Sequence, residues 1–551
     1  MPKQSKENSN RLNSSDDLEI AGYLQTASKK ESSGSSMEDS SEQVQESIII
    51  IDFGSQYTLL IARRIREAKV YCEVFGPNIT WDQIKKLNPK GIILSGGPHS
   101  VYESNSPKAP SWIYKIGIPI LGICYGMQLM VQHFGGIINR GAKREYGHAI
   151  INQIGHSLLF KDLPEEIAVW MSHGDKIESL PEKFSCIAFT DNAPFAAITD
   201  GQDLIGIQFH PEVVHTQQGK EILSNFLFQI CKCSSSWTPI NFISWTVQEI
   251  QRQIGDKSVI CALSGGVDSA VTAALISKAI GNRLKCVFVN NGLLRKNESD
   301  RIQQVFKKHF NLIYEDSSDK FLNALEGIID PEEKRKIIGN EFISVFEEIA
   351  QNIGEIDFLA QGTLYPDVIE SENVSGDSVK IKTHHNVGGL PEKMNMQLVE
   401  PLRYLFKDEV REIGKTLGLP DDMIYRHPFH GPGLAIRIKG EVTPEKLRIL
   451  RDCDWIIINE IKKKNLYHSL WQTFAVLTDS KTVGVMGDHR TYEYVVAIRA
   501  VKSEDGMTAD WVKFPYDLLS VMSNRIVNEV EGVNRVVYDI TSKPPGTIEW
   551  E

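Results

Sequence analysis

Short apolar runs alternate with segments of helical length, in two successive sets, along most of this 551-residue chain. The first set, from residue 47, contains the runs SIIIIDFG, KVYCEVFG, KGIILSGG and IPILGICYG. The second set follows CKCSSSWTP (231–239) and contains KSVICAL, LKCVFVN, NLIYED and EIDFLAQG. Strands that alternate with helices form parallel sheets. The pattern therefore predicts an α/β fold with two doubly wound parallel-sheet domains.

The two ends of the chain differ from this pattern. After Arg426 the runs LAIRI, TVGVMG, YVVAIRAV and RVVYDI follow with few regular crossovers, which predicts a smaller α+β domain. The first 46 residues hold eleven serines, nine acids and five bases, a composition typical of disorder. We therefore expect four parts: a disordered tail (1–46), two α/β domains (47–237 and 238–427) and an α+β domain (428–551).

Charge and cysteine content restrict the class of protein. Sixty basic residues against 71 acidic ones give a net charge of −11, which disfavours nonspecific binding to nucleic acid. The eight cysteines contain no CxxC pair, the first residues lack the order of a signal peptide, and no apolar run reaches the ~18 residues of a membrane span. We expect a soluble cytosolic protein with neither a membrane nor a nucleic-acid partner.

A cysteine with the surroundings of a nucleophile follows one apolar run. Gly122 and Gly126 flank Cys124, and a helical pattern comes next. Glycines permit a sharp strand-to-helix turn that exposes the side chain, and a helix N-terminus favours the thiolate. In the segment LIGIQFHPEV, His210 and Glu212 point the same way if the backbone is extended. We predict a triad of Cys124, His210 and Glu212.

The motifs GICYGMQ, SGGPHSV, WMSHGD and FHPEV resemble those of class I glutamine amidotransferases over about 47–233. The resemblance implies that Cys124 attacks the glutamine side-chain amide, forms a thioester and releases ammonia. It also implies oxyanion and glutamine-binding roles for Gly96, Gly97, Tyr125, Gln128, Ser172, His173 and Asp175. For the triad residues alone, a cysteine protease of another fold is the alternative, although no papain-like CGSCW string is present.

A second glycine-rich loop, SGGVDS, lies between the run KSVICAL and a helical pattern. Backbone N–H groups of such a loop bind phosphate at a helix N-terminus, but the lysine of a Walker loop is missing. Gly414-Lys415-Thr416 lies in a helical context and is not a Walker loop. The loop resembles that of the ATP pyrophosphatases, which implies ATP binding by Ser264, Gly265, Gly266, Val267, Asp268, Ser269 and Val289. Asp268 is the expected Mg²⁺ ligand, and Asn290 stands where that family has Asp.

Several downstream strings together resemble the GMP synthetase family: EKRKIIG, QGTLYPDVIES, KTHHNVGGLP, PLRYLFKDEVR, RHPFHGPGLAIR, GDHRTYEY and SKPPGTIEWE. The resemblance implies that glutamine, ATP, water and xanthosine monophosphate (XMP) give GMP, AMP, diphosphate and glutamate, with Mg²⁺, in a homodimer. It implies XMP contacts by Arg335, Gln472, Lys543, Ile548 and Glu549. A solvated helix face for Arg335 and a plain terminal strand for Lys543 are the structural alternatives.

A glycine-containing segment over about 367–396 has few apolar anchors and predicts a mobile lid. Its candidate residues are Asp367, Glu370, Lys382, His384 and His385. His430 departs from the family, which commonly has Pro there. Two other functions stay open at this point: a glutamine-dependent NAD synthetase, and a binding protein whose sites are relics. A nitrilase-type glutaminase, typical of the former, lacks the GICYG motif.

Overall fold

The computed structural model describes residues 46–372, 396–429, 431–486, 488–503 and 508–551. The described residues divide into two compact units, of which the first ends at Phe242 and the second begins at Ile243. The predicted disordered tail lies outside the described residues except for Glu46. This residue belongs to the folded part, where its carboxylate accepts hydrogen bonds from the Ser234 N–H (2.8 Å) and hydroxyl (2.7 Å).

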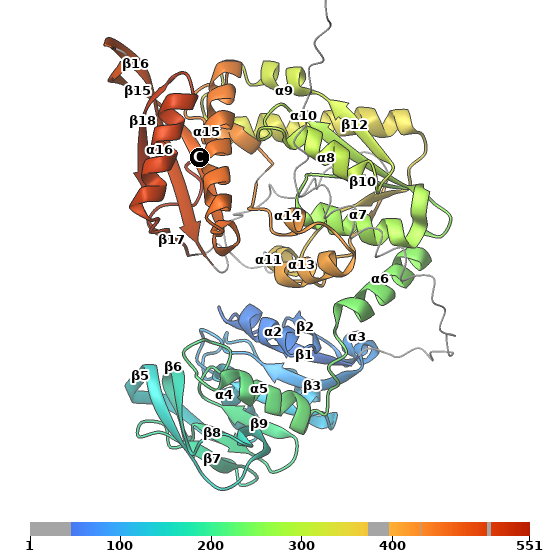
Figure 1. The fold of residues 1–551 in the computed structure, drawn as a ribbon. Helices are drawn as coiled ribbons and strands as arrows, with labels where there is room; N and C mark the ends of the chain where they lie inside the picture. Colours follow the sequence, from blue (N-terminus) through green and yellow to red (C-terminus); the bar gives the residue numbers. More distant parts are fainter. Residues whose placement is uncertain (1–45, 373–395, 430, 487, 504–507) are drawn as a thin grey trace, which may run out of the picture. The chain divides into compact units, whose positions relative to one another are not determined.

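The first unit contains a nine-stranded sheet in the order β2-β1-β3-β4-β9-β8-β7-β5-β6 (Figure 1). Its first five strands are parallel, as predicted, and the four isoleucines 48–51 of β1 are fully buried. Continuous apolar strands are typical of a sheet whose faces are both covered. The strands are β1 (Ser47–Ile51), β2 (Tyr71–Phe75), β3 (Pro89–Leu94), β4 (Ile120–Ile123) and β9 (Leu204–Ile207). The helices are α2 (Thr58–Glu67), α3 (Trp81–Ile84), α4 (Tyr125–His133) and α5 (Gly219–Ser224).

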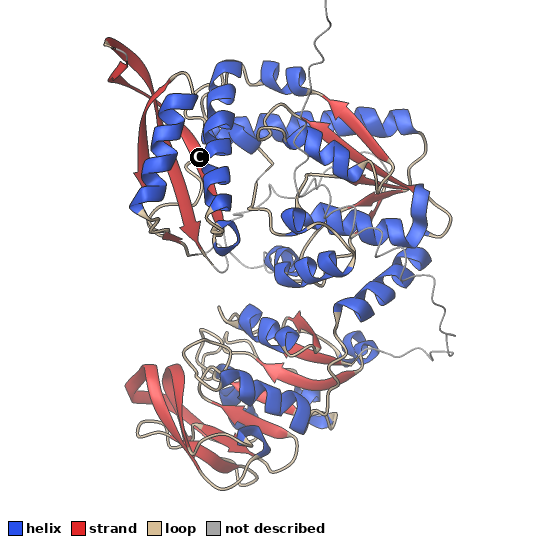
Figure 2. Cartoon of the chain, viewed as in Figure 1, coloured by secondary structure: helices blue, strands red, loops and turns tan. Residues whose placement is uncertain are grey.

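The other four strands of this sheet are antiparallel, which the sequence pattern did not predict. They are joined by loops and a short 3₁₀ turn (Leu158–Phe160), so no helix carries the chain back across the sheet, and Figure 2 shows this half as strands and loops. Short connections favour antiparallel pairing. The strands are β5 (Ile137–Gln153), β6 (Glu166–Ser179), β7 (Ser185–Phe189) and β8 (Ala197–Thr199).

The second unit contains an all-parallel sheet in the order β12-β11-β10-β13-β14, which confirms the second doubly wound domain. The chain leaves β10 on one side for β11 and β12 and on the other for β13 and β14, so a ligand crevice is expected at the carboxyl end of β10. The strands are β10 (Val259–Ala262), β11 (Leu284–Asn290), β12 (Leu312–Asp316), β13 (Phe358–Ala360) and β14 (Gln397–Val399). The helices are α6 (Pro239–Ile254), α7 (Val267–Ile280), α8 (Glu298–Phe306), α9 (Ser318–Ala324), α10 (Pro331–Ile353), α11 (Tyr365–Glu372), α13 (Lys407–Thr416) and α14 (Asp421–Ile424).

The C-terminal part of this unit is the predicted α+β arrangement. Strand β16 pairs with β15 on one side and with β18 and β17 on the other, and helices α15 and α16 pack nearby (Figure 1). Its apolar core is continuous with that of the parallel sheet, so the expected division near residue 427 stays a prediction. The elements are α15 (Pro444–Lys463), β15 (Gln472–Met486), β16 (His489–Lys502), β17 (Asp510–Trp511), α16 (Tyr516–Glu529) and β18 (Val533–Asp539).

One predicted strand of this part is wrong. The run LAIRI lies in a 3₁₀ helix, Gly433–Arg437, and only Ile438 after it forms an isolated bridge with Leu477. The run is buried all round, so it has no polar alternation by which a strand is distinguished from a helical turn.

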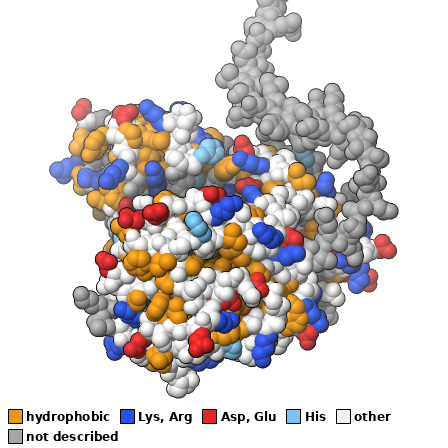
Figure 3. Space-filling view, turned by 90° about the horizontal axis from the view of Figure 1, so that it is seen from below, with side chains coloured by type: hydrophobic (Ala, Val, Ile, Leu, Met, Phe, Trp, Pro, Cys, Tyr) orange, Lys and Arg blue, Asp and Glu red, His pale blue; other side chains and the backbone are white. Residues whose placement is uncertain are grey.

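The surface shown in Figure 3 carries basic and acidic side chains interspersed with apolar ones, in keeping with the nearly balanced composition. Among the helices of the described residues, none combines the length and apolar character needed to cross a membrane.

Candidate active sites

Cys124 stands at a strained turn between β4 and α4. Its backbone angles are φ 50° and ψ −103°, a conformation that non-glycine residues rarely adopt. A Cβ on Gly126 would lie 2.3 Å from the Leu94 carbonyl oxygen, and one on Gly122 would lie 2.8 Å from the Gly126 carbonyl oxygen. Glycines on both sides therefore let strand and helix approach closely, and the predicted sharp strand-to-helix turn at Cys124 is confirmed.

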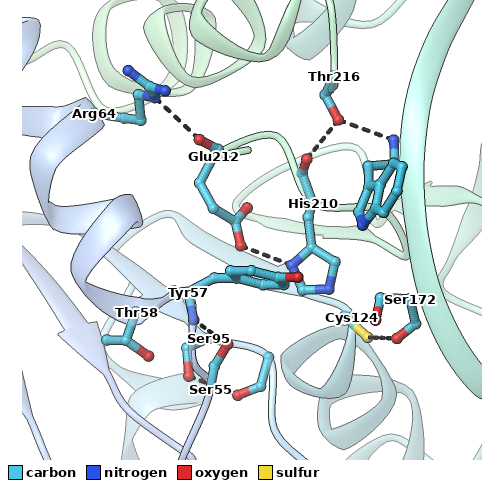
Figure 4. A network of polar contacts seen from close by, with 12 residues as sticks. Ser55, Tyr57, Thr58, Arg64, Ser95, Cys124, Ser172, His210, Glu212 and Thr216 are labelled. Atoms are coloured by element: carbon cyan, nitrogen blue, oxygen red, sulfur yellow. Dashed lines mark hydrogen bonds and ion pairs between the residues drawn. The ribbon is translucent and has the colours of Figure 1, made fainter. Parts of the chain in front are cut away.

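His210 lies beside Cys124 because β9 is the parallel neighbour of β4 in the sheet. Its Nδ1 is 2.7 Å from Glu212 Oε1, and both side chains are almost completely buried (Figure 4). The expected extended backbone is wrong: β9 ends at Ile207, and His210 to Glu212 begin a turn. The turn still joins imidazole and carboxylate, because the Thr216 hydroxyl donates to the His210 carbonyl (2.6 Å).

The electrostatics of this triad favour an imidazolium. Burial opposes protonation of His210, but the Glu212 carboxylate and the neighbouring Cys124 side chain outweigh it and hold the pKa of His210 well above 6.5. Within the described residues, Glu212 Oε2 has no hydrogen-bond partner, so the carboxylate directs its interaction to the ring. An imidazolium beside a thiol stabilises the thiolate, which is the reactive nucleophile.

Replacing Glu212 with Gln should remove the charge that raises the pKa of His210. We expect glutamine hydrolysis to fall roughly 10²-fold or more, and the basic limb of its pH profile to move to lower pH. Because the pKa of His210 is higher in the folded than in the unfolded chain, protonation of His210 stabilises the fold. This stabilisation is fully present below the unfolded pKa of about 6.5 and is lost as the pH rises through the folded pKa. The measurement is kcat/KM against pH, with exposed Glu178→Gln as control; an unmoved basic limb contradicts the assignment.

The expected oxyanion residues surround Cys124. A Cβ on Gly96 would lie 3.1 Å from His210 Cε1, and one on Gly97 would lie 3.1 Å from the Tyr125 ring. Tyr125 is the first residue of α4, whose first N–H groups have no acceptor inside the helix. The structure therefore brings the loop after β3 and the start of α4 to the same place as Cys124.

The expected glutamine-binding residues lie on α4 and β6. The Ser172 carbonyl accepts from Cys124 Sγ (3.7 Å), and Gln128 is buried and donates to Gln208 (3.3 Å). Asp175 is more accessible: its carboxylate accepts from the Tyr102 hydroxyl (2.9 Å). Tyr102 was not predicted.

The ring of His173, another residue of this expected set, is directed to an acid. Its Nε2 is 3.2 Å from the largely buried Glu145 carboxylate, while its Nδ1 lies 3.0 Å from the Asp175 carbonyl oxygen. Burial works against ionisation of Glu145, but the contacts with His173 lower the pKa of that carboxyl. Glu145 was not predicted, since an acid in an exposed-looking strand carries no local signal.

The SGGVDS loop occupies the carboxyl end of β10 and leads into α7, as predicted for a phosphate loop. Ser264 and Ser269 brace it: the Ser264 N–H and hydroxyl both lie 3.2 Å from Ser269 Oγ, which also donates to the Gly266 carbonyl (3.0 Å). Helix α7 begins at Val267, so its N-terminus faces the loop.

Asp268 in the first turn of α7 is paired with a cation, Lys407, that was not predicted. Lys407 Nζ lies 2.8 and 2.6 Å from the two Asp268 carboxylate oxygens, and both side chains are partly exposed. On the neighbouring strand, Val289 is buried at the end of β11, and the Asn290 amide donates to Asp316 (3.2 Å). The Asn290 amide can therefore hydrogen-bond to Asp316, whereas a carboxylate at position 290 would be repelled by Asp316.

A buried charged cluster forms around Glu549. Its carboxylate accepts two hydrogen bonds from Arg437 (2.8 and 3.1 Å) and one from Gln472 (2.7 Å), and Arg437 is only 1% exposed. The structure therefore brings together two predicted XMP residues and one unpredicted arginine. Arg437 could have been recognised as a site residue because it is a charge within the apolar run LAIRI, and a buried charge requires a partner.

Of the remaining predicted XMP residues, Ile548 and Lys543 lie on the same terminal segment, and Arg335 of α10 contacts it. Arg335 Nη2 donates to the Glu551 carbonyl, two residues beyond Glu549. Ile548 packs against the β15 and β16 side of this domain, and its carbonyl accepts from fully buried Arg499 (3.3 Å). Lys543 pairs through its backbone with Ala509, at 3.0 and 2.7 Å.

The predicted lid is covered only in part. Asp367 lies in the first turn of α11, where its carboxylate accepts from the Leu364 N–H (3.2 Å), and the backbone of Glu370 belongs to the same helix. Lys382, His384 and His385 lie outside the described residues, as does His430.

A thiol triad on a glutaminase-type elbow and a lysine-free phosphate loop at a sheet switch point define a glutamine amidotransferase joined to an ATP-dependent synthetase. Family models match accordingly: class-I glutamine amidotransferase over residues 49–230, NAD synthase over 240–318 and the GMP synthase C-terminal domain over 459–550. The NAD synthase match spans the phosphate loop and not the C-terminal cluster.

Relatives similar over nearly their whole length show the family. A glutamine-hydrolyzing GMP synthase of Dehalococcoides mccartyi is 61% identical over 95% of this chain and 99% of its own. A glutamine-hydrolyzing GMP synthase of Brachyspira hyodysenteriae is 57% identical over 92% of this chain and 99% of its own. The crystal structure of a putative GMP synthase subunit from Thermoplasma acidophilum is 29% identical, covering 38% of this chain and 98% of its own, with a TM-score of 0.30. The chain belongs to the glutamine-hydrolyzing GMP synthase family.

Proposed function

We propose that this enzyme converts XMP to GMP by combining the two sites. The Cys124 thiolate attacks the glutamine amide, and the tetrahedral adduct collapses to a thioester with release of ammonia. Water then hydrolyses the thioester, which yields glutamate and regenerates the thiol. At the second site XMP attacks the α-phosphorus of ATP, which releases diphosphate and leaves an O–AMP group on the purine. Ammonia then displaces AMP and gives GMP.

The observation that carries this proposal is the pairing, in one chain, of a triad with a 2.7 Å His210–Glu212 contact and a phosphate loop without lysine. The former supplies ammonia, and the latter suits a reaction in which diphosphate is the leaving group. Gln472, Glu549 and Arg437 form one cluster, and together with Arg335 and Lys543 they offer donors, an acceptor and cations for a purine nucleotide.

The test is diphosphate release from purified enzyme with ATP and XMP, with glutamine or ammonium salt as nitrogen donor. We expect diphosphate, AMP and GMP in equal amounts with either donor. Absence of XMP-dependent diphosphate with both donors would overturn the proposal, and release with nicotinic acid adenine dinucleotide in place of XMP would favour an NAD synthetase.

Mg²⁺ is part of this proposal. Among the described residues, no cluster of three or more His, Cys, Asp or Glu side chains forms an all-protein cage. Asp268 nevertheless fits, because Mg²⁺ at nucleotide sites is commonly held by one or two carboxylates together with substrate phosphates. Bound there, the ion would neutralise charge on the leaving diphosphate. Asp268 would hold it, and Lys407, released from the carboxylate, would remain as a nearby cation.

Replacing Asp268 with Asn should raise the Mg²⁺ concentration needed for half-maximal ammonia-driven synthesis. We expect roughly a 10-fold increase or more. A carboxylate in direct contact with Mg²⁺ contributes over about 1.4 kcal/mol to binding of the ion even with partial screening. The measurement is a Mg²⁺ titration at fixed ATP after chelation of residual metal. Asp408→Asn, an exposed acid beside Lys407, is the control, and an unchanged midpoint for Asp268→Asn argues against the assignment.

The proposed homodimer rests on the hairpin formed by β15 and β16, which extends beyond the neighbouring helices in Figure 1. Val483, Val485 and Tyr492 are 57%, 74% and 66% exposed. Val483 lies opposite Tyr492 in the register, and Val485 is two residues along the strand, so the three share one face. A second copy of this chain would cover that face.

Val485→Glu should shift the protein toward the monomer. A charge placed in an apolar interface costs several kcal/mol unless it is paired. Sedimentation equilibrium should give twice the 62.0 kDa chain mass for the wild type and a lower mass for the variant. Ile329→Glu, at a 63% exposed site away from the hairpin, is the control. A wild type of one chain mass at micromolar concentration contradicts the dimer.

We also propose a cytosolic location and a closing role for the segment that follows α11. The location is supported by the eight cysteines, all of which are free thiols, as reducing compartments maintain. The closing role is supported by the glycine content between Asp367 and Met396 and by three candidate donors, Lys382, His384 and His385.

A further inference from the structure

Arg426 connects the phosphate loop to helix α8. Its Nη1 donates to the Gly265 carbonyl (2.9 Å), and its Nη2 forms an ion pair with Glu298 Oε1. The two side chains are 17% and 8% exposed, so solvent screens the pair only weakly. One planar guanidinium therefore holds a loop carbonyl with one nitrogen and a buried carboxylate with the other.

Glu298 gives this contact a rigid base. It is the first residue of α8, and its second carboxylate oxygen accepts from the Arg295 N–H (2.9 Å). The carboxylate is therefore fixed by the helix start as well as by Arg426. Movement of the Arg426 guanidinium away from Gly265 would also disturb its ion pair with Glu298.

The peptide between Gly265 and Gly266 is held at both of its polar groups. Its carbonyl accepts from Arg426, and its N–H, on Gly266, donates to Ser264 Oγ (3.3 Å). Gly265 has φ +73°, and a Cβ there would lie 2.8 Å from Ile302 Cδ1 and 2.9 Å from Arg426 Nη1. Two adjacent glycines have wide conformational freedom, so this peptide would rotate easily without an anchor.

A rotated peptide would change the charge that the loop presents. Because N–H and C=O point in opposite directions in a trans peptide, a flip would turn the Gly265 carbonyl toward the side of Ser264 Oγ and turn the N–H away. A carbonyl oxygen in a phosphate cradle repels phosphate oxygens, whereas N–H groups attract them. The orientation of this one peptide would therefore change how well the loop accepts a triphosphate.

We propose that Arg426 is a positioning residue for ATP, which keeps the Gly265–Gly266 peptide in its phosphate-accepting orientation before the nucleotide arrives. This inference rests on the proposed function of the loop as the ATP site. Arg426 also begins the segment whose Pro428 carbonyl accepts from Gln472 (3.0 Å), so the anchor of the phosphate loop continues into the Glu549 cluster.

The test compares Arg426→Gln, Arg426→Lys and Lys296→Ala in ammonia-driven synthesis, which bypasses the glutaminase site. Arg426 and Lys296 both line a cavity of about 720 Å³ beside α8. Lys296 pairs with Asp452 (2.7 Å) and not with the phosphate loop, so Lys296→Ala is the matched control. We expect Arg426→Gln to raise the KM for ATP about 10-fold or more, because a hydrogen bond from a charged group is lost, with kcat at saturating ATP within about threefold. Arg426→Lys, which keeps the charge but not the fork, should give a smaller rise.

A purely structural role would lower the melting temperature without this KM-against-kcat split. An ATP KM within twofold of wild type for Arg426→Gln, or an equal rise for Lys296→Ala, would overturn the inference. If Arg426→Gln does not fold, Arg426→Lys is judged by the same comparison with Lys296→Ala. Calorimetric binding of Mg-ATP to each variant separates the two proposals: wild type that binds ATP but makes no GMP contradicts the proposed function alone.

Discussion

Cys124→Ala should abolish glutamine-driven GMP formation and leave ammonia-driven formation within about twofold of wild type. The thiolate is the group that forms the covalent bond to the glutamine carbonyl, and removal of a covalent nucleophile commonly costs 10³-fold or more. Ammonium salt supplies the same nitrogen without that step. The measurement is GMP formation with each donor at saturating ATP and XMP.

Cys186→Ala is the matched control for this experiment, because Cys186 is a half-buried thiol on β7 whose Sγ donates only to backbone carbonyls. It should retain both activities. Loss of both activities in Cys124→Ala, with an unchanged melting profile, would contradict the separation of glutaminase and synthetase chemistry between the two units.

Glu549→Gln should weaken the use of XMP in synthesis with glutamine and ammonia alike. The substitution leaves the guanidinium of Arg437, which is 1% exposed, without its carboxylate, and breaking a buried ion pair costs about 3–5 kcal/mol. At the proposed XMP site, the amide also presents a different hydrogen-bonding edge to the purine. We expect the KM for XMP to rise at least 10-fold, by the loss of a charged hydrogen bond, and the melting temperature to fall.

Glu551→Gln separates these two effects. Glu551 is the carboxylate partner of Lys334, a fully buried lysine, so its loss should also destabilise the fold. Burial already lowers the pKa of Lys334, and deprotonation limits the cost. The control should therefore melt earlier while keeping its KM for XMP. Equal KM changes in both variants would show that Glu549 acts through stability alone. Alkylation of Cys124 by a glutamine-analogue diazoketone tests whether the glutaminase unit is still folded in each variant.

The parts of the fold that were predicted correctly depend on local patterns. Continuous apolar runs followed by glycine turns identified the parallel strands, and GICYG and SGGVDS identified the two turns at their carboxyl ends. The conformation of Cys124 and the start of α7 at Val267 follow from neighbours within a few residues. Local sterics therefore suffice to place both loops.

The errors and omissions have a common cause in distant contacts. The strand predicted at LAIRI is a 3₁₀ turn, because it packs on elements far along the chain that apolar periodicity does not reveal. The antiparallel half of the first sheet follows from strand pairing, which no single run specifies. Arg437, Arg499 and Lys407 were unassigned, since each pairs with residues more than 40 positions away.

Residue order alone was enough to identify two α/β sheets, a thiol triad and a phosphate loop, because periodicity, glycine placement and motif spacing act over short stretches. Folding of the whole chain decided which charges meet: Glu549 with Arg437 across 112 positions, and Arg426 with Glu298 across 128. Burial makes such pairs obligatory, since an unpaired charge in the interior is costly. The identity of the partner, however, is set by packing and not by any local pattern.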